Sequence, residues 1–463
     1  MVSKSSLFFL NFILFLGVSF VMVMFWAVSG FMGEMVVLMS SLVVTFLSIF
    51  YLYNQGMSVF SLSDWFLSDS MSSLMCLMSC FVIVLSFLCS DVEFNMMKKD
   101  PGFSFFLLLI LFISLVFFYS SSVFSFYFLM EASLIPILFL ILSWGYQPER
   151  VQAGFLIIMY TVVASMPFLV SISFLLNIMG SDNFNCLLAS RGVGVSIELM
   201  FWFFIILGFL VKLPVFMLHS WLPKAHVKAP VGGSMILAGI MLKFGGFGLW
   251  RFLPVLGRAD SEVLEFTMVF TMWGGLVCSM ICLCHYDMKA MIAFSSISHM
   301  SAVVLGMLTF YCMGWMGGVA MMFIHGVCSP CLFAMANYSY KFSGSRSIFL
   351  CKGLLKVCPL ISLFWFMFCS FNLGCPPSLN FFSEVFLSLS GLWYSWYFIC
   401  ILIFMVFLGG ASSVYLYCTL NHGAHSYVLL SKSGVSDRMS LMGVSCCFFL
   451  FFSFFVMDFV FCL

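Results

Sequence analysis

The sequence is poor in charge. Asp, Glu, Lys and Arg make up only 8% of its 463 residues, whereas ordinary globular proteins carry about 25%. Eighteen basic residues nearly balance 17 acidic ones, so no basic field is present that would hold nucleic acid. Hydrophobic residues reach 64%. A soluble fold cannot bury that much apolar surface, but a lipid bilayer can. The composition therefore predicts a polytopic membrane protein with a lipid bilayer around it.

Motifs that hold cofactors are also missing. The sequence has no G-x-G-x-x-G turn after a strand, no phosphate-binding loop and no paired C-x-x-C motifs for an iron–sulfur cluster. Its 19 cysteines lie singly in apolar runs, unlike a disulfide framework. His325, Cys328 and Cys331 have the order of a metal site, but a composition rich in cysteine explains them better. We expect no nucleotide, redox cofactor or metal in this chain.

Long apolar runs fill most of the chain. A membrane span needs about 20 apolar residues in succession, and about fourteen runs meet that rule. The alternating pattern of a membrane β-barrel is absent, so all-α spans are predicted. The runs begin near Leu7, Met35, Met71, Phe103, Val123, Val151, Leu199, Ala229, Val263, Met288, Tyr311, Leu355, Leu392 and Leu441.

The basic residues of the connectors are unevenly distributed. If all fourteen runs cross the membrane, four Lys/Arg fall on the side that holds both termini and twelve on the other side. An excess of Lys/Arg marks the cytoplasmic or matrix side, so both termini are predicted to lie on the opposite side. The four residues counted with the termini are Lys4, Arg191, Arg251 and Arg258.

Four ionisable residues lie inside predicted spans, where a charge costs at least about 2.5–3.5 kcal/mol. Such residues usually mark ion or proton pathways, although structural ion pairs that fix helix packing are the alternative. The four are Glu131, Lys212, Lys243 and Glu384. His299 and His325 also lie within spans and favour the pathway.

Two of these charged residues lie near prolines that break a helix. Pro214 follows Lys212 by two residues, and its ring excludes the carbonyl of Leu210, which is predicted to be free near the ammonium. Pro376–Pro377 precedes Glu384 by about two helical turns. Broken helices at membrane depth are typical of polar cavities in transporters.

The segment HSWLPKAHVKAP after the first break is predicted to be a loop. It contains His219 and His226, which are candidates for a proton relay because imidazole titrates near neutral pH. Loop histidines without a role are an equal alternative. The glycines that follow allow neighbouring helices to approach closely.

These segments closely resemble the subunit 4 family of mitochondrial NADH dehydrogenase, which are antiporter-like membrane subunits of respiratory complex I. The resemblance rests on FLMEASLIPILFLILSWGYQPERV, LVKLPVFMLHSWLPKAHVKAP, DMKAMIAFSSISHM, MMFIHG and GCPPSLNFFSE, in that order between residues 128 and 384. The family implies fourteen spans in two inverted repeats, with broken helices at Pro214 and Pro376–Pro377. It also implies a multi-pass protein of the mitochondrial inner membrane whose N-terminus faces the intermembrane space.

The resemblance implies a role for each intramembrane charge. Glu131 resembles the membrane glutamate that pairs with the lysine of the broken helix, here Lys212. Lys243 resembles the central lysine, and Glu384 resembles the acidic residue near the exit of the second half. The histidines of the axis that connects these groups are His299 and His325. Relatives commonly carry an acid in place of Lys228 and hydroxyl residues in place of Cys328 and Cys331.

The implied function is proton translocation in the membrane arm of NADH:ubiquinone oxidoreductase, driven by quinone reduction elsewhere. NADH, FMN, iron–sulfur clusters and ubiquinone are then expected in other subunits, with subunits 2 and 5 as neighbours. A free-standing cation/proton antiporter and a structural spacer remain the alternatives. The regions implied are 1–101 with three spans, 102–254 and 255–420 as the two antiporter-like repeats, and 421–463 with the last span.

Overall fold

The computed structural model describes residues 41–43, 45, 48, 60–61, 65–90, 102–145, 147–190, 199–258, 261–424 and 437–455, and these are almost entirely helical. The predicted spans that begin near Leu7 and Met35 lie mostly outside them. Every later predicted start falls within about one helical turn of an observed helix start. The prediction of an all-α polytopic membrane protein is confirmed.

Ten helices in the described part of the chain are long and apolar enough to cross a membrane. Two of the ten contain a local irregularity, at Ser133 between α6 and α7 and at the π-helical turn η2 between α12 and α13. The elements are α3 (Ser70–Cys89), α5 (Gly102–Tyr119), α6 and α7 (Val123–Ala132, Leu134–Trp144), α8 (Arg150–Met179), α12, η2 and α13 (Val231–Ile236, Leu237–Met241, Leu242–Leu256), α14 (Ser261–Cys284), α15 (Met288–Leu308), α16 (Cys312–Ser343), α20 (Trp396–Asn421) and α21 (Asp437–Phe455).

Two further apolar helices are interrupted where the prolines predict a break. Helix α10 (Leu199–Lys212) ends two residues before Pro214, and the chain resumes as α11 (Trp221–Lys228). Helix α18 (Pro359–Leu373) ends before Pro376–Pro377, and α19 (Leu379–Tyr394) follows. The remaining elements are the short helices α9 (Phe184–Ser190) and α17 (Leu354–Val357), and the strands β1 (Phe60–Ser61) and β2 (Leu67–Ser68), which pair antiparallel with Phe60 opposite Ser68.

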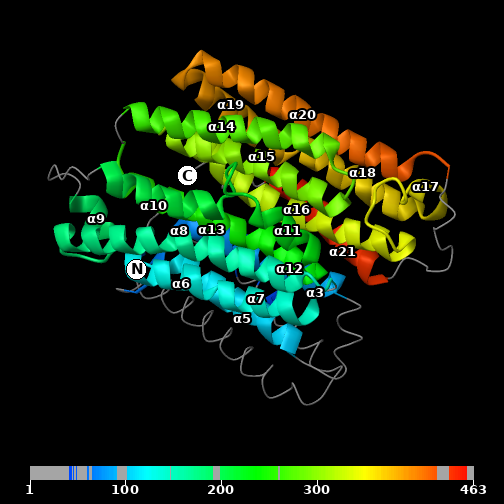
Figure 1. The fold of residues 1–463 in the computed structure, drawn as a ribbon, viewed down its shortest axis with the longest axis horizontal. Coiled ribbons are helices and arrows are strands. Elements are labelled where there is room, and N and C mark those ends of the chain that lie inside the picture. Colours follow the sequence, from blue (N-terminus) through cyan, green and yellow to red (C-terminus); the bar gives the residue numbers. More distant parts are fainter. Residues whose placement is uncertain are drawn as a thin grey trace.

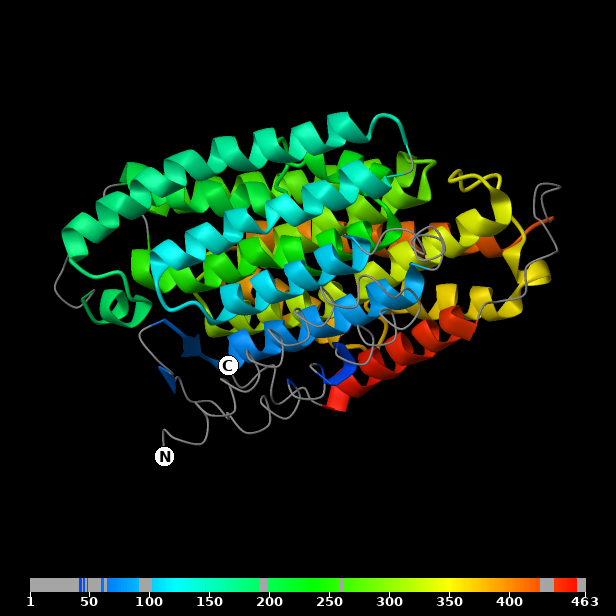
Figure 2. The same ribbon diagram turned by 90° about the horizontal axis from the view of Figure 1, so that it is seen from below.

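The helices lie side by side along a common direction, as the two views in Figures 1 and 2 show. Helices α3, α13, α15 and α16 are buried almost all round, whereas α8, α20 and α21 keep wide exposed faces. These faces carry large apolar side chains such as Val163, Phe407 and Phe448. An apolar outer surface of this kind is the one that lipid covers, so the buried inner helices are where polar groups can be sheltered.

Two details of the predicted topology are wrong. The segment after the first break, predicted to be a loop, forms helix α11, because only Ala229–Pro230 beyond it stops regular hydrogen bonding. Arg251, counted as a connector residue, lies inside α13 and is buried. Lys289, counted on the opposite side, likewise lies inside α15 and is buried. The charge count therefore loses one residue from each side, while Lys4 and Arg191 lie outside the described residues.

Candidate functional site

Glu131 and Lys212 form an ion pair between α6 and the last residue of α10. The Lys212 ammonium lies 3.1 Å from Glu131 Oε1 and donates a hydrogen bond to the Met130 carbonyl at 3.0 Å. The lysine side chain is 4% exposed and the glutamate side chain 20%. A charge at this depth is held by its partner, since removing one member of a buried pair leaves the other uncompensated.

The backbone around the first break is satisfied differently from the prediction. The Leu210 carbonyl, predicted to be free, accepts a hydrogen bond from the Val215 amide at 3.3 Å. The Val211 carbonyl accepts one from the Trp221 indole at 3.2 Å. Backbone carbonyls that lose their helical hydrogen bond at a proline break must find other partners inside a membrane. Here the residues beyond the proline provide those partners. Lys212 therefore binds a carbonyl of α6 and not one of its own helix.

Lys243 lies two residues after the π-helical turn η2. Its ammonium donates to the Ala238 carbonyl at 2.7 Å and lies 3.1 Å from Nδ1 of His325 on α16. When Lys243 is protonated its ammonium has donors only, so His325 then accepts at Nδ1 and carries its own proton on Nε2. A Cβ at Gly326 would lie 3.3 Å from Lys243 Cε and would collide with Met78. This glycine allows α16 and α3 to close around the lysine.

His299 and Glu384 extend the contact of Lys243 with His325 toward the second break. The rings of His325 and His299, the latter on α15, have centroids 5.6 Å apart. His299 Nδ1 lies 3.7 Å from Glu384 Oε1 on α19. We call these four side chains, Lys243, His325, His299 and Glu384, the polar row. The row crosses four helices, α13, α16, α15 and α19. Its spacing is within reach of one water or a small side-chain movement at each step.

Glu384 lies against the backbone of the second break. Asn380 Nδ2 donates to its Oε1 at 3.3 Å. A Cβ at Gly374 would lie 2.9 Å from Oε2, and Gly374 has the left-handed φ of 75° that a glycine adopts without strain. The break thus makes room for the carboxylate, which agrees with the prediction that the prolines and the acid belong to one site.

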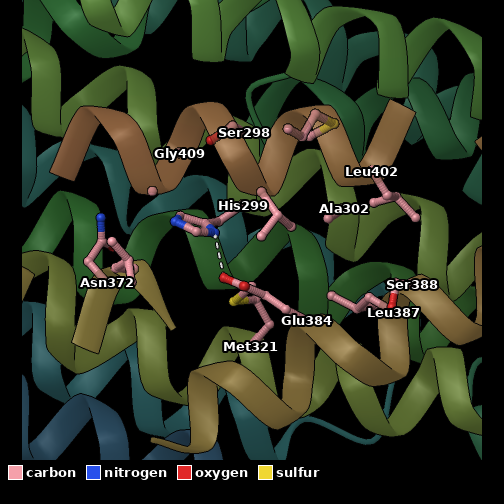
Figure 3. A pocket seen from close by; sticks show the side chains of 14 residues that line it. Ser298, His299, Ala302, Met321, Asn372, Glu384, Leu387, Ser388, Leu402 and Gly409 are labelled. Carbon is pink, nitrogen blue, oxygen red and sulfur yellow. Dashed lines mark ion pairs between the residues drawn. The ribbon is translucent and has the colours of Figure 1, made fainter. Parts of the chain in front are cut away.

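A cavity of about 30 Å³ adjoins Glu384 and His299, and we call it the Glu384 cavity. Figure 3 shows the imidazole and the carboxylate facing each other, with Gly409 and Leu402 of α20 on the opposite wall. A cavity needs about 10–15 Å³ to hold one water, so this space accepts about two. Water there would bridge the gap between the ring and the acid.

The space between Lys212 and Lys243 is different. A cavity of about 10 Å³ lies beside Lys212 and reaches Leu237 and Met241, the two ends of η2. Apart from Lys212, Thr161 and Trp221, its lining is aliphatic: Leu134, Ile137, Ile157, Leu237 and Met241. Within the described ranges, no hydrogen bond or ion pair connects the two lysines. The structure therefore groups the predicted residues into an ion pair and a polar row.

The two other candidate histidines lie beside these groups. His226 on α11 is fully buried, stacks on Phe333 with ring centroids 4.4 Å apart, and has no hydrogen-bond partner on either ring nitrogen in the described part of the chain. His219 lies within the first break, where it stacks on Phe216. The charges of Lys289 and Lys243 both reach His226, and His226 in turn acts electrostatically on His325 of the polar row.

One buried ion pair was missed by sequence reasoning. Arg251 on α13 binds Asp69, the N-cap residue of α3, and both side chains are almost fully buried. The guanidinium also lies over the rings of Phe247 and Trp250, 5.2 and 5.0 Å from their centroids. The two residues stand 182 positions apart and each lies near the end of an apolar run. No local signal in the sequence pairs them.

Lys228 and Cys328, which the resemblance sets apart from the family pattern, also find partners. The Lys228 ammonium donates to the Glu149 carboxylate at 2.5 Å, and this holds the pKa of that carboxyl below its ordinary value. Cys328 donates to the Phe368 carbonyl at 3.6 Å. Among the residues that the structure describes, no three His, Cys, Asp or Glu side chains converge on a point that would hold a metal ion.

Comparison with known proteins shows the family. Residues 120–409 match the transmembrane family described as NADH:quinone oxidoreductase/Mrp antiporter. The NADH-ubiquinone oxidoreductase chain 4 of Ceratitis capitata is 39% identical over 400 residues, which cover 86% of this chain and 88% of the relative. This chain belongs to the NADH-ubiquinone oxidoreductase chain 4 family. Its counterpart in Locusta migratoria is 42% identical over 308 residues, 66% of this chain and 68% of the relative.

The fold of the chain 4 family extends to distant structures. A chain of the respiratory complex I from Thermus thermophilus superposes with a TM-score of 0.84 at 20% identity, over 97% of each chain. The resemblance predicted from the motifs is confirmed, and the chain is a membrane-arm component of the complex I type, with mitochondrial relatives. The family match over residues 120–409 includes both broken helices of this chain.

Proposed function

We propose that this chain translocates protons in the membrane arm of mitochondrial NADH:ubiquinone oxidoreductase. The observation that carries the proposal is the arrangement of titratable groups in the interior: the ion pair of Glu131 and Lys212, and the polar row that ends at Glu384. Buried ionisable groups are costly in a membrane, and their juxtaposition supports transfer over a merely structural role.

The ion pair acts as the switch of the mechanism. Unit charges 4 Å apart interact by about 4 kcal/mol at an effective dielectric of about 20, which corresponds to about a thousandfold in proton affinity. While Glu131 stays close, Lys212 keeps its proton. When Glu131 moves away, burial favours the neutral amine, and Lys212 releases the proton toward the interior of the bundle.

The polar row then carries the proton onward. Hydration of the small cavity beside Lys212 opens the passage to Lys243, and its aliphatic lining keeps that passage closed when it is dry. His325 accepts a proton from Lys243 at Nδ1 and releases a proton from Nε2. The imidazole ring thus passes a proton from one side to the other. His299 delivers it to Glu384. His226, buried without a partner, is a candidate for holding water beside Lys243.

The driving energy comes from outside this chain. In the proposal, quinone reduction in other subunits moves Glu131, and the NADH site, FMN and iron–sulfur clusters reside there too. Subunits 2 and 5 are the proposed neighbours, and the inner membrane is the proposed location, with the N-terminus toward the intermembrane space. The proposed working units are the repeats 102–254 and 255–420.

Substitution of Glu131 tests the proposal. In the assembled complex in proteoliposomes, Glu131→Gln removes the charge that holds the Lys212 proton, and NADH-driven pumping is expected to be lost. Glu149→Gln is the matched control, because it removes a lysine-paired glutamate at the surface, and pumping is expected to stay normal. Normal pumping by an assembled Glu131→Gln complex would refute the proposed role.

A free-standing cation/proton antiporter is the second candidate, favoured because the matching family also includes Mrp antiporters. Such a protein works alone. Ion exchange by the purified chain in liposomes, abolished by Lys212→Met, would support it. If the purified chain exchanges no ions while the assembled complex pumps protons, the antiporter candidate is excluded and the complex I role stands.

A further inference from the structure

Pro376 leaves one carbonyl of α18 without its helical partner. In an α-helix, the carbonyl of Asn372 would accept a hydrogen bond from the amide four residues later, but that residue is Pro376, which has no N–H. Asn372 is only 8% exposed, so water outside the bundle does not replace the lost donor. A buried carbonyl needs a partner, and this one must find its partner beyond the break.

The side chain of Asn380 supplies the missing donor. Asn380 is the second residue of α19 and is buried. Its Nδ2 donates to the Asn372 carbonyl at 3.3 Å and to Glu384 Oε1 at 3.3 Å. Both partners accept hydrogen bonds only when the acid is ionised, so the amide nitrogen and not its oxygen faces them, with one N–H for each. A single amide therefore joins the end of α18 to the acid on α19, across the break.

The carboxylate is constrained at both of its oxygens. Oε1, which accepts from Asn380, is also the oxygen that lies 3.7 Å from Nδ1 of His299. Oε2 lies beside Gly374, the C-cap residue of α18, where a Cβ would be only 2.9 Å away. The two contacts leave the carboxylate of Glu384 little freedom to rotate, and they keep Oε1 turned toward the imidazole.

The first break is arranged differently. There the carbonyl released by Pro214, that of Leu210, accepts from the backbone amide of Val215. The charged residue of that break, Lys212, binds the Met130 carbonyl on another helix. The released carbonyl and the charge thus have separate partners at the first break. At the second break one side chain serves both, so a change in the path of the backbone there acts directly on the acid.

We infer that Asn380 is a positioning residue, which ties the Glu384 carboxylate to the carbonyl released at the second break and holds Oε1 toward His299. This inference rests on the proposed proton-translocating function and names the residue that sets the geometry of its last step. Asn380 itself exchanges no proton. A shift of α18 against α19 moves the amide and the carboxylate together, and this changes the distance that a proton crosses from His299.

Two substitutions at Asn380 test this role in the assembled complex in proteoliposomes. Asn380→Leu keeps the approximate size of the side chain and removes both donors. NADH-driven pumping by this variant is expected to slow about tenfold, as expected for the loss of a hydrogen bond to a charged group. Asn380→Gln keeps an amide with two N–H donors and is expected to recover most of the parent rate.

Asn421→Leu is the matched control. Asn421 is also a buried asparagine, and its Nδ2 donates to the Tyr417 carbonyl at 3.1 Å. In the described part of the chain this amide donates to no carboxylate, so the same change of side chain removes a carbonyl contact alone. Pumping by the Asn421→Leu complex is expected to stay normal. An equal loss in both leucine variants would mean that Asn380 only packs α18, and the positioning role would be wrong.

A density map of the Asn380→Leu complex separates this role from the proposed function. The Glu384 carboxylate is expected to turn away from His299, with Oε1 farther than 3.7 Å from Nδ1. A carboxylate that stays in place would overturn the inference, whatever the pumping rate.

The pumping results make the same separation. If Glu131→Gln abolishes pumping but Asn380→Leu pumps like the parent, the positioning role is wrong and the proposed function stands. If pumping survives Glu131→Gln, the function fails, and the density map still decides whether Asn380 holds the acid. Should Asn380→Leu not assemble, Asn380→Ser replaces it, because a single short hydroxyl cannot donate to the carbonyl and the carboxylate together.

Discussion

The two halves of the proposed pathway hold their charges in opposite ways. In the first half, a cation is fixed by an anion at 3.1 Å beside a small, mostly aliphatic cavity. In the second half, Glu384 faces an imidazole and an amide, next to a larger cavity. A direct charge pair acts as a switch, because separating its two charges costs free energy. Neutral polar groups with water between them conduct protons instead. In the proposed mechanism, the first half therefore gates protons and the second half carries them.

The largest effect is expected from breaking the charge balance of the first half. Lys212→Met or Glu131→Gln alone leaves one buried charge without its partner, at a cost of about 3–5 kcal/mol. The double variant is expected to recover most of that stability and still fail to pump. Thermal unfolding and proteoliposome pumping of the three complexes measure both effects. Recovery of pumping in the double variant would contradict a switching role for the pair.

In the second half, removing the charge of Glu384 is expected to impair proton pumping without lowering the stability of the complex. Glu384→Gln keeps the size of the side chain and can still bind Asn380 and water. We expect unfolding close to that of the parent complex, with proton transfer slowed at least about a hundredfold, as when a positioned acid–base group is lost. Glu149→Gln, which removes a glutamate charge at the surface, is the control. A large loss of stability in Glu384→Gln would place this acid with the structural ion pairs.

Arg251 provides a buried charge that lies outside the pathway. Arg251→Met leaves Asp69 buried without its cation, and we expect a loss of about 3–5 kcal/mol. Pumping per NADH oxidised should stay unchanged in complexes that assemble, because Arg251 has no contact with the ion pair or the polar row. A changed proton-to-electron ratio would show that the pathway includes this end of α13.

The smallest effect is expected at the surface pair of Lys228 and Glu149. The pKa of Glu149 is lowered mainly by the hydrogen bond from Lys228, so the pair stabilises the fold at pH values above the ordinary glutamate pKa of 4.5. That contribution is lost as the pH falls through the lower, folded-state value. Glu149→Gln should remove this pH dependence with little change near neutrality, and salt should weaken the parent pair. Unfolding curves from pH 3 to 7 would check it.

Much of this site is predictable from sequence because its parts have strong local signals. Charges inside apolar runs and prolines beside them are visible without a structure, and they led to Glu131, Lys212, Lys243 and Glu384. Their grouping is not visible, since Lys243 and His325 meet across 82 positions. The carbonyl of Leu210 shows a second limit: sequence predicts which bond a proline breaks, but the replacement partner depends on the path of the chain.

The single π-helical turn before Lys243 has a consequence for how this protein tolerates change. The five residues of η2 form a π-helical turn, which is wider than an α-helical one. With this turn, Leu237 and Met241 line the cavity beside Lys212 while Lys243 contacts His325. Shortening this turn by one residue would rotate everything after it by about 100°. Lys243 would then leave His325, and Arg251 would leave Asp69, although every side chain was kept. Deletions here should be far less tolerated than substitutions.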